Sequence, residues 1–235
     1  MRIVSWNCGG ALRRKFQSLI ALEADICVVQ ECEDPARSNN SRYCDWANTH
    51  LWVGDNKNRG LGVFAKPNIS IEPANLESEH LQTFLSCVVN KAILLVGVWT
   101  RRSTSYDYRY IGQLWKFIQL HRASLAQSNT IVIGDLNSNV MWDKRHAVAS
   151  HSNVVRDLRS LGLESAYHAT RNIPQGLESD PTFYLQRNLN KQYHIDYAFL
   201  PRHLIGACTV HVGKASDWIG VSDHMPVVVD IEGVK

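Results

Sequence analysis

The 235-residue sequence lacks several features that would assign it to a specialised class of protein. Its six cysteines include no C-x-x-C pair, which argues against a thiolate zinc site. No apolar run is long enough to cross a bilayer, and no apolar leader precedes the first strand-like segment. Repeats, low-complexity segments and obvious linkers are also absent. We therefore expect a single domain over residues 1–235, without a membrane partner, in a reducing cytoplasm.

The sequence also lacks a strong charge of either sign. Its formal net charge is +3 and its pI is about 8.5, with 45% hydrophobic and 20% charged residues. These proportions are typical of an ordinary globular protein, which we expect to be a monomer. The weak positive charge permits a polyanionic partner but does not require one.

Short β-type runs dominate the chain, and about three helical patterns lie between them. Helical spacing of apolar residues predicts helices near 12–20, 111–118 and 154–161, with Gly162 ending the last one. The segment 34–49 is polar and carries Pro35, so we expect a surface loop. The pattern favours a mixed sheet, or two stacked sheets, covered by helices. Expected strands are 2–7, 26–30, 51–54, 61–66, 69–72, 84–90, 92–99, 130–133, 182–185, 194–200, 207–212 and 225–231.

Two polar side chains follow the apolar run 130–133 at the point where Gly134 ends it. Asp135 and Asn137 are two positions apart, so in an extended chain they point the same way and reach one cleft. A carboxylate that orients a water, beside an amide that steadies an anionic oxygen, forms a hydrolytic pair. The alternative is an Asx turn that caps the strand.

Other acids and amides occupy similar places, at or near the ends of expected strands. Hard oxygen ligands of this kind suit Mg²⁺, for which Mn²⁺ can substitute, whereas Zn²⁺ would prefer more histidine or cysteine. The set comprises Asn7, Glu31, Asp135, Asn137, Asp196, Asp223 and His224.

Five fragments carry a resemblance to a known superfamily. In chain order they are Ser5-Trp6-Asn7, Gln30-Glu31, Gly134-Asp135-Leu136-Asn137, His194-Ile195-Asp196-Tyr197 and Ser222-Asp223-His224. Together they resemble the exonuclease–endonuclease–phosphatase superfamily, which includes exonuclease III-like AP endonucleases and DNase I-like nucleases. The resemblance implies an α/β fold, a four-layer αββα sandwich with two facing mixed β-sheets. It also implies metal-dependent hydrolysis of a phosphoester.

The resemblance assigns a role to each matching residue. Glu31 is implied as the principal metal ligand, with Asn7 and Asp223 nearby. In the catalytic set, Asp135 is implied to position and deprotonate the attacking water, and Asn137 to donate hydrogen bonds at the scissile phosphate. The remaining pair is His224, implied to contact a non-bridging oxygen, and Asp196, which would orient a histidine by accepting its N–H.

The sequence departs from the family where many relatives carry a tyrosine that contacts the phosphate. Trp99 stands at that place and can donate through its indole N–H but cannot ionise. Arg101, Arg102 or Tyr106 are candidates to replace the tyrosine. The two arginines can clamp a phosphate bidentately, or they can belong to a solvated turn.

A second group of candidates lies around the loop 186–192. Phe183 and Tyr184 occupy a place where aromatic residues of AP endonuclease relatives shape the sugar pocket, although core packing is the alternative. His194 precedes Asp196 by two residues, so we expect both to face the cleft. Isolated loop cations can follow a nucleic-acid backbone or merely be solvated; they are Lys144, Arg145, Arg187 and Lys191.

Three functional hypotheses follow from these observations. The first is a Mg²⁺-dependent phosphodiester hydrolase, a nuclease acting on DNA and similar to exonuclease III or AP endonucleases. The second is a phosphatase or phosphodiesterase for a small soluble phosphoester, which the weak net charge permits. The third is a non-catalytic binding module on the same fold. The retention of every acidic motif argues against this third hypothesis.

Overall fold

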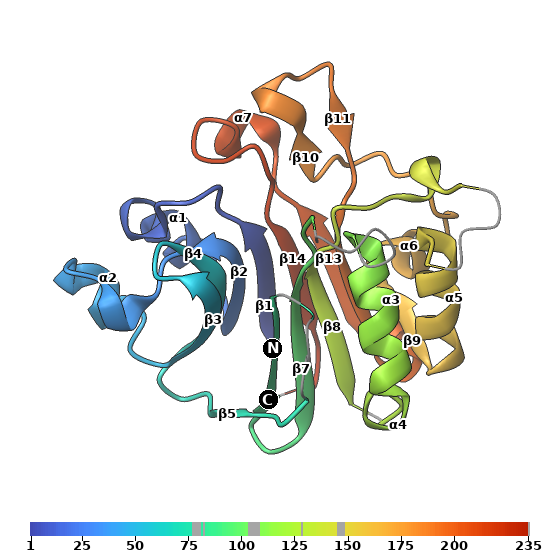
Figure 1. Ribbon diagram of the computed structural model, residues 1–235, viewed down its shortest axis with the longest axis horizontal. Coiled ribbons are helices and arrows are strands. Elements are labelled where there is room, and N and C mark those ends of the chain that lie inside the picture. The colour runs from blue at the N-terminus through green and yellow to red at the C-terminus, as the bar shows by residue number, and fades with distance from the viewer. Residues whose placement is uncertain (77–80, 82, 103–108, 128, 145–148, 235) are drawn as a thin grey trace.

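Two six-stranded mixed sheets form the centre of the molecule (Figure 1). The computed structural model describes residues 1–76, 81, 83–102, 109–127, 129–144 and 149–234. The first sheet has the spatial order β13 (Cys208–Val212), β14 (Val227–Ile231), β1 (Arg2–Asn7), β2 (Ile26–Cys32), β4 (Arg59–Ala65) and β3 (His50–Asn56). The second has the order β5 (Ile71–Pro73), β6 (Phe84–Val89), β7 (Ile93–Trp99), β8 (Thr130–Asp135), β12 (Asp196–Pro201) and β9 (Leu163–Ser165).

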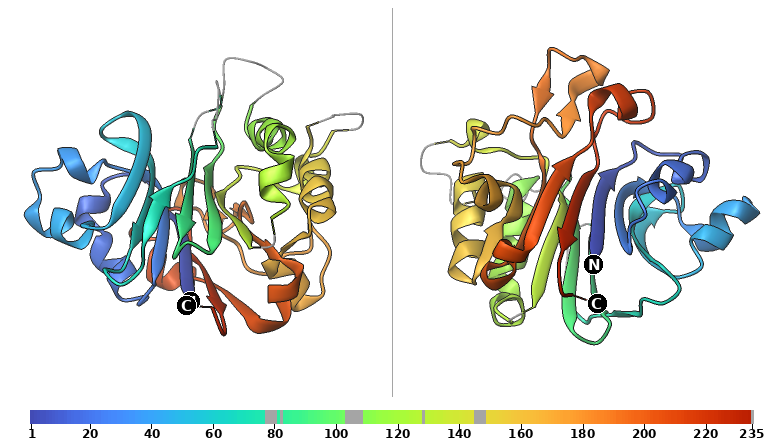
Figure 2. Two further views of the ribbon diagram at one scale, coloured as in Figure 1. Left: turned by 90° about the horizontal axis from the view of Figure 1, so that it is seen from below. Right: turned by 180° about the vertical axis from the view of Figure 1, so that it is seen from behind.

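Helices cover the outer face of each sheet (Figures 1 and 2). The first sheet packs against α1 (Phe16–Ile20), α2 (Ser41–Trp46) and α7 (Ala215–Trp218). The second packs against α3 (Ile111–Leu120), α4 (Arg122–Leu125) and α5 (His151–Ser160). The short α6 (Ala166–Arg171) contributes to the core between the sheets. The four-layer αββα sandwich expected from the sequence is therefore confirmed.

Alternation along the strands explains why the sheets are buried on both faces. Ile3 of β1 and Ile131 of β8 belong to the core between the sheets. Val4, the next residue of β1, packs instead with α1, α2 and α7, and Val132 packs with α3 and α5. Because successive side chains of a strand point to opposite faces, a continuous apolar run supplies two cores at once.

The expected strands are present with bounds that shift by a few residues. The expected helices and the expected loop differ more in their outcome. The helix beginning near 151 ends where predicted, since Gly162 has φ +83° directly after the C-cap Leu161. The segment 34–49 was expected to be a loop, which is wrong: it contains α2, whose N-cap Asn40 accepts a hydrogen bond from the Tyr43 N–H. The pattern over 12–20 forms a 3₁₀ turn, Leu12–Arg14, followed by the short α1.

Strand pairing brings distant polar residues to one end of the sandwich. In the first sheet β1 and β2 run parallel, with Asn7 opposite Gln30. In the second sheet β7 and β8 run parallel, with Trp99 opposite Asp135, and β12 pairs antiparallel so that Asp196 also lies opposite Asp135. A small hairpin of β10 (Phe183–Tyr184) and β11 (Gln192–Tyr193) stands above this end (Figure 1). Among the described residues, no helix is both long and apolar enough to cross a membrane.

Candidate active site

Asp135, at the end of β8, lies at the centre of a group of buried polar side chains. The conformation of Gly134 allows β8 to place it there. Gly134 has φ +152°, and a Cβ added there would lie 1.9 Å from the Val98 carbonyl oxygen of β7. Only glycine permits this approach of the two strands. The Asp135 side chain is fully buried and accepts hydrogen bonds from the Asn137 backbone N–H at 2.8 Å, from Asn137 Nδ2 at 2.9 Å and from Asn7 Nδ2 at 3.0 Å.

Asn137 holds Asp135 in place. Its backbone is left-handed, with φ +45°, which asparagine tolerates better than most residues. Its amide nitrogen donates to Asp135 and, at 3.0 Å, to the Thr100 carbonyl oxygen. The Asx turn of the alternative interpretation is present, and its geometry directs the Asn137 amide at the Asp135 carboxylate.

His224 and Asp196 form a buried ion pair next to Asp135. His224 Nδ1 lies 3.0 Å from Asp196 Oδ2 and 3.3 Å from Oδ1. The Ser222 hydroxyl fixes the loop, since it donates to the Asn7 carbonyl oxygen at 2.8 Å and accepts from the His224 N–H at 3.1 Å. The structure therefore brings His224 onto Asp196, as the resemblance implied.

The electrostatics of this group favour a protonated histidine. Burial lowers the pKa of His224, but the charges of Asp196, Asp135 and Asp223 and the hydrogen bond to Asp196 outweigh it and raise that pKa to about 9. Burial and the neighbouring Asp196 charge raise the pKa of Asp135 to about 7, although His224 and the donors from Asn7 and Asn137 oppose them. A carboxyl that titrates near neutral pH is suited to act as a general base.

Glu31 faces the same group from the first sheet. It sits at a bulge between Gln30 and Cys32 with φ +62°, which turns its side chain out of the strand alternation. Glu31 Oε1 lies 3.3 Å from the Asn7 Nδ2 that also binds Asp135, and 2.7 Å from an Arg59 nitrogen. One amide therefore joins a carboxylate from each sheet.

The donor set fits a divalent cation that prefers hard oxygens. Ligand atoms of Asp135, Asp196 and His224 lie within 4.8 Å of one another, and they form the cluster of potential metal-binding side chains found among the described residues. Because protonated His224 has no lone pair to offer, the oxygens of Asp135 and Asp196 are the ligand atoms in this cluster. Glu31 adds a further carboxylate, whose charge is balanced by the Arg59 guanidinium. Asp223, partly buried, directly precedes His224, and its backbone carbonyl oxygen accepts the Tyr184 N–H at 2.8 Å. Carboxylate and amide oxygens suit Mg²⁺ and Mn²⁺ better than Zn²⁺.

Trp99 lies between two guanidinium groups. Its buried ring is 4.8 Å from Arg101 Cζ and 5.4 Å from Arg59 Cζ, which are cation–π distances. Arg101 also pairs with Asp55 at 2.5 Å. Arg102 is exposed, and Tyr106 lies outside the described residues. Arg59 was not a candidate in the sequence analysis, because its approach to Glu31 depends on the register between β2 and β4.

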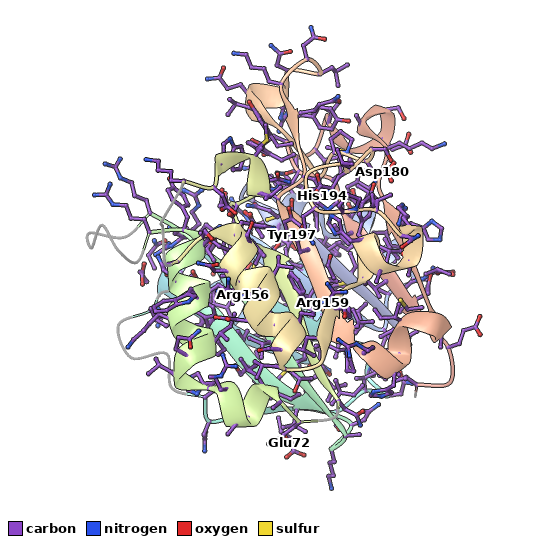
Figure 3. All side chains as sticks on the ribbon, turned by 90° about the vertical axis from the view of Figure 1, so that its right-hand side faces the viewer. Glu72, Arg156, Arg159, Asp180, His194 and Tyr197 are labelled. Carbon is purple, nitrogen blue, oxygen red and sulfur yellow. The ribbon has the colours of Figure 1, made fainter. Side chains whose placement is uncertain are left out.

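Two other candidates have close packing partners. His194 lies two residues before Asp196, the first residue of β12. Its buried ring is 4.5 Å from the Tyr167 ring, and its Nδ1 bonds the Asp180 carbonyl oxygen at 2.8 Å (Figure 3). Burial lowers the pKa of His194 to about 4. The Tyr184 ring is buried in the core of the first sheet, whereas Phe183 lies 4.5 Å from the His224 ring.

The two facing sheets bring acidic side chains and a charged histidine together at one end. This arrangement is expected of metal-dependent phosphoesterases, and comparison with known families supports that class. Residues 4–224 match the Endonuclease/Exonuclease/phosphatase family, and the chain belongs to that family. The family consists of phosphoester hydrolases that are generally dependent on divalent metals, so the chain is a phosphoesterase by membership. A search of curated proteins found no match.

Solved structures share the fold at low sequence identity. A 3′-5′ exonuclease from Neisseria meningitidis has a TM-score of 0.71 at 16% identity, covering 98% of this chain and 99% of that one. A 3′ phosphatase from Neisseria bound to a product DNA hairpin has a TM-score of 0.73 at 15% identity, with 99% of each chain covered. An AP endonuclease from Archaeoglobus fulgidus has a TM-score of 0.70 at 16% identity, again covering 99% of each chain.

Proposed function

We propose that the protein is a Mg²⁺-dependent phosphodiester hydrolase that acts as a nuclease on DNA. The observation that carries this proposal is the convergence of Glu31, Asp135, Asp196 and His224 from both sheets onto one buried group. A phosphodiester is anionic and resists attack by hydroxide, so catalysis needs positive charge at the phosphate and a base for the water. Both are present within this group.

The residues of the chain divide this work. Asp135, whose pKa is near 7, takes a proton from a water, and the water oxygen then forms the new bond to phosphorus while the bond to the leaving oxygen breaks. Protonated His224 neutralises charge that develops on a non-bridging oxygen, and Asp196 keeps its ring oriented and charged. Glu31, Asn7 and Asp223 would hold a divalent cation, which supplies further charge neutralisation and lowers the pKa of a bound water.

DNA is the substrate class that the surroundings favour. Arg59 and Arg101 bring two guanidinium groups to the Trp99 side of the site, where phosphates flanking the scissile bond would meet them. In addition, the similar Neisseria structure is bound to a product DNA hairpin. The small-phosphoester hypothesis has no comparable observation in its favour.

A substrate panel tests the proposal. Abasic duplex DNA, plain duplex and single-stranded DNA, RNA and small phosphoesters would be incubated with Mg²⁺ or with chelator. We expect cleavage of at least one DNA substrate in Mg²⁺, none in chelator, and none by Asp135→Asn, which keeps the shape of the side chain but not its basicity. Turnover of small phosphoesters alone, or undiminished cleavage by Asp135→Asn, would overturn the proposal.

A further inference from the structure

Exposed apolar side chains are concentrated beside the candidate active site. In the described part of the chain, five of the eight large hydrophobic residues that are exposed lie in segments 140–142 and 177–189; they are Met141, Trp142, Leu177, Leu185 and Leu189. The start of the second segment lies beside the first, because a Cβ at Gly176, the residue before Leu177, would lie 2.6 Å from Val140 Cγ1. A concentration of this kind marks an interaction site more often than scattered exposed residues do.

A series of aromatic rings connects this surface to His224. Trp142 is 46% exposed, and its ring lies 5.2 Å from that of Tyr193. The Tyr193 ring is 6.3 Å from the Phe183 ring across the β10–β11 hairpin, and the Phe183 ring is 4.5 Å from His224. The outermost ring of the series is therefore partly exposed to solvent and is linked to His224 through two intervening rings.

The charge around these rings suits a polyanion. Lys144, Arg187 and Lys191 are exposed within 140–144 and 177–193, and Arg187 also donates to the Gly220 and Val221 carbonyl oxygens. The acidic residues of these two segments are Asp143, Glu178 and Asp180. Each is engaged within the protein, Asp143 by the backbone N–H groups of His151 and Ser152, Glu178 by His168 and Asp180 by Arg171. Proteins bind single-stranded nucleic acids with positively charged side chains, which attract the phosphates, and with exposed aromatic rings, on which the bases stack.

We propose that Trp142, supported by Tyr193, forms a stacking site for an unpaired nucleobase, and that Lys191, two residues before Tyr193 in the chain, holds an adjoining phosphate. The inference rests on the proposed nuclease function and adds a substrate class to it. Nucleotides that are single-stranded or unpaired next to the scissile phosphate can stack on Trp142, whereas bases inside an intact duplex cannot expose a face to it.

Binding measured in chelator separates this inference from catalysis. A fluorescein-labelled oligo(dT) and a blunt-ended duplex of equal length would be titrated with wild type, Trp142→Ala, Trp142→Phe and the control Leu120→Ala, which removes an exposed apolar side chain of α3. We expect wild type to bind oligo(dT) more tightly than duplex. Trp142→Ala should weaken oligo(dT) binding by roughly 5- to 150-fold, the loss of one stacked base, with duplex binding unchanged.

Trp142→Phe keeps a stacking face and should retain most of the affinity, and Leu120→Ala should bind like wild type. Unfolding temperatures would verify that the variants are folded. Wild-type affinity in Trp142→Ala, or an equal loss in Trp142→Phe, would overturn the stacking site while wild-type DNA cleavage still upheld the nuclease. Absence of any nucleic-acid binding and cleavage by wild type would overturn both.

Discussion

Replacing Asp196 by asparagine tests the electrostatic design of the site, because it removes one charge and little volume. Asp196 is buried, and the negative charge of its carboxylate is the main cause that raises the pKa of His224 against the effect of burial. The pKa of His224 is about 9 in the folded chain, against 6.5 for an ordinary histidine. At 1.36 kcal/mol for each pH unit, the folded state favours the protonated ring by about 3 kcal/mol.

The sign of the pH dependence follows from this raised pKa. The stabilisation is complete below pH 6.5, where histidine is protonated in the unfolded chain as well, and it is lost as the pH rises through 9. Asp196→Asn should therefore destabilise the metal-free protein by about 3 kcal/mol at pH 6, with a smaller effect at pH 10. The pKa of His224 itself should fall from about 9 to its ordinary value of 6.5 or below, since the effect of burial is then no longer outweighed.

The assay combines an NMR titration of the histidine rings with urea unfolding at pH 6 and pH 10, both in chelator. Asp230→Asn is the matched control, because it removes a carboxylate from a more exposed pair with Arg2 at 2.8 Å. That variant should leave the pKa of His224 unchanged. An unaltered His224 titration in Asp196→Asn, or equal destabilisation at the two pH values, would refute the reasoning.

Three further outcomes are expected. Glu31→Gln should raise the Mg²⁺ concentration needed for half-maximal activity, and an unchanged metal titration would remove Glu31 from the ligand set. Arg59→Ala should tighten Mg²⁺ binding measured by calorimetry, because the guanidinium 2.7 Å from Glu31 competes with the cation; weaker metal binding would contradict this. Gly134→Ala should cost about 1–3 kcal/mol or more, since its Cβ meets the Val98 carbonyl oxygen, and thermal unfolding at the wild-type temperature would refute the close approach.

The candidate catalytic group was accessible from the sequence because its members stand at strand ends within short, specific fragments. Asp135 ends the buried strand β8 directly after Gly134, and His224 follows Asp223 before the last strand. The strand and helix patterns alone favoured a mixed sheet or two stacked sheets covered by helices. The four-layer fold was implied by the resemblance that those fragments carry in order along the chain.

Contacts that depend on how distant segments pair in the fold could not be predicted from the sequence. Arg59 reaches Glu31 only because β4 pairs with β2 across a bulge. Trp142 reaches Tyr193 only because the segment 140–142 lies beside the β10–β11 hairpin. The packing of the His194 ring against Tyr167 was likewise not accessible, because α6 is remote from His194 in the sequence.

A crystal structure of the protein with Mn²⁺, using anomalous scattering to locate the ion, tests the central claim most directly. Mn²⁺ takes the same oxygen ligands as Mg²⁺ and can be distinguished from water. We predict an anomalous peak bound by Glu31, with Asn7 and Asp223 close to it, on the side of Asp135 that faces the first sheet. A fully loaded crystal with no peak there, or with its peak at a different part of the molecule, would contradict the account.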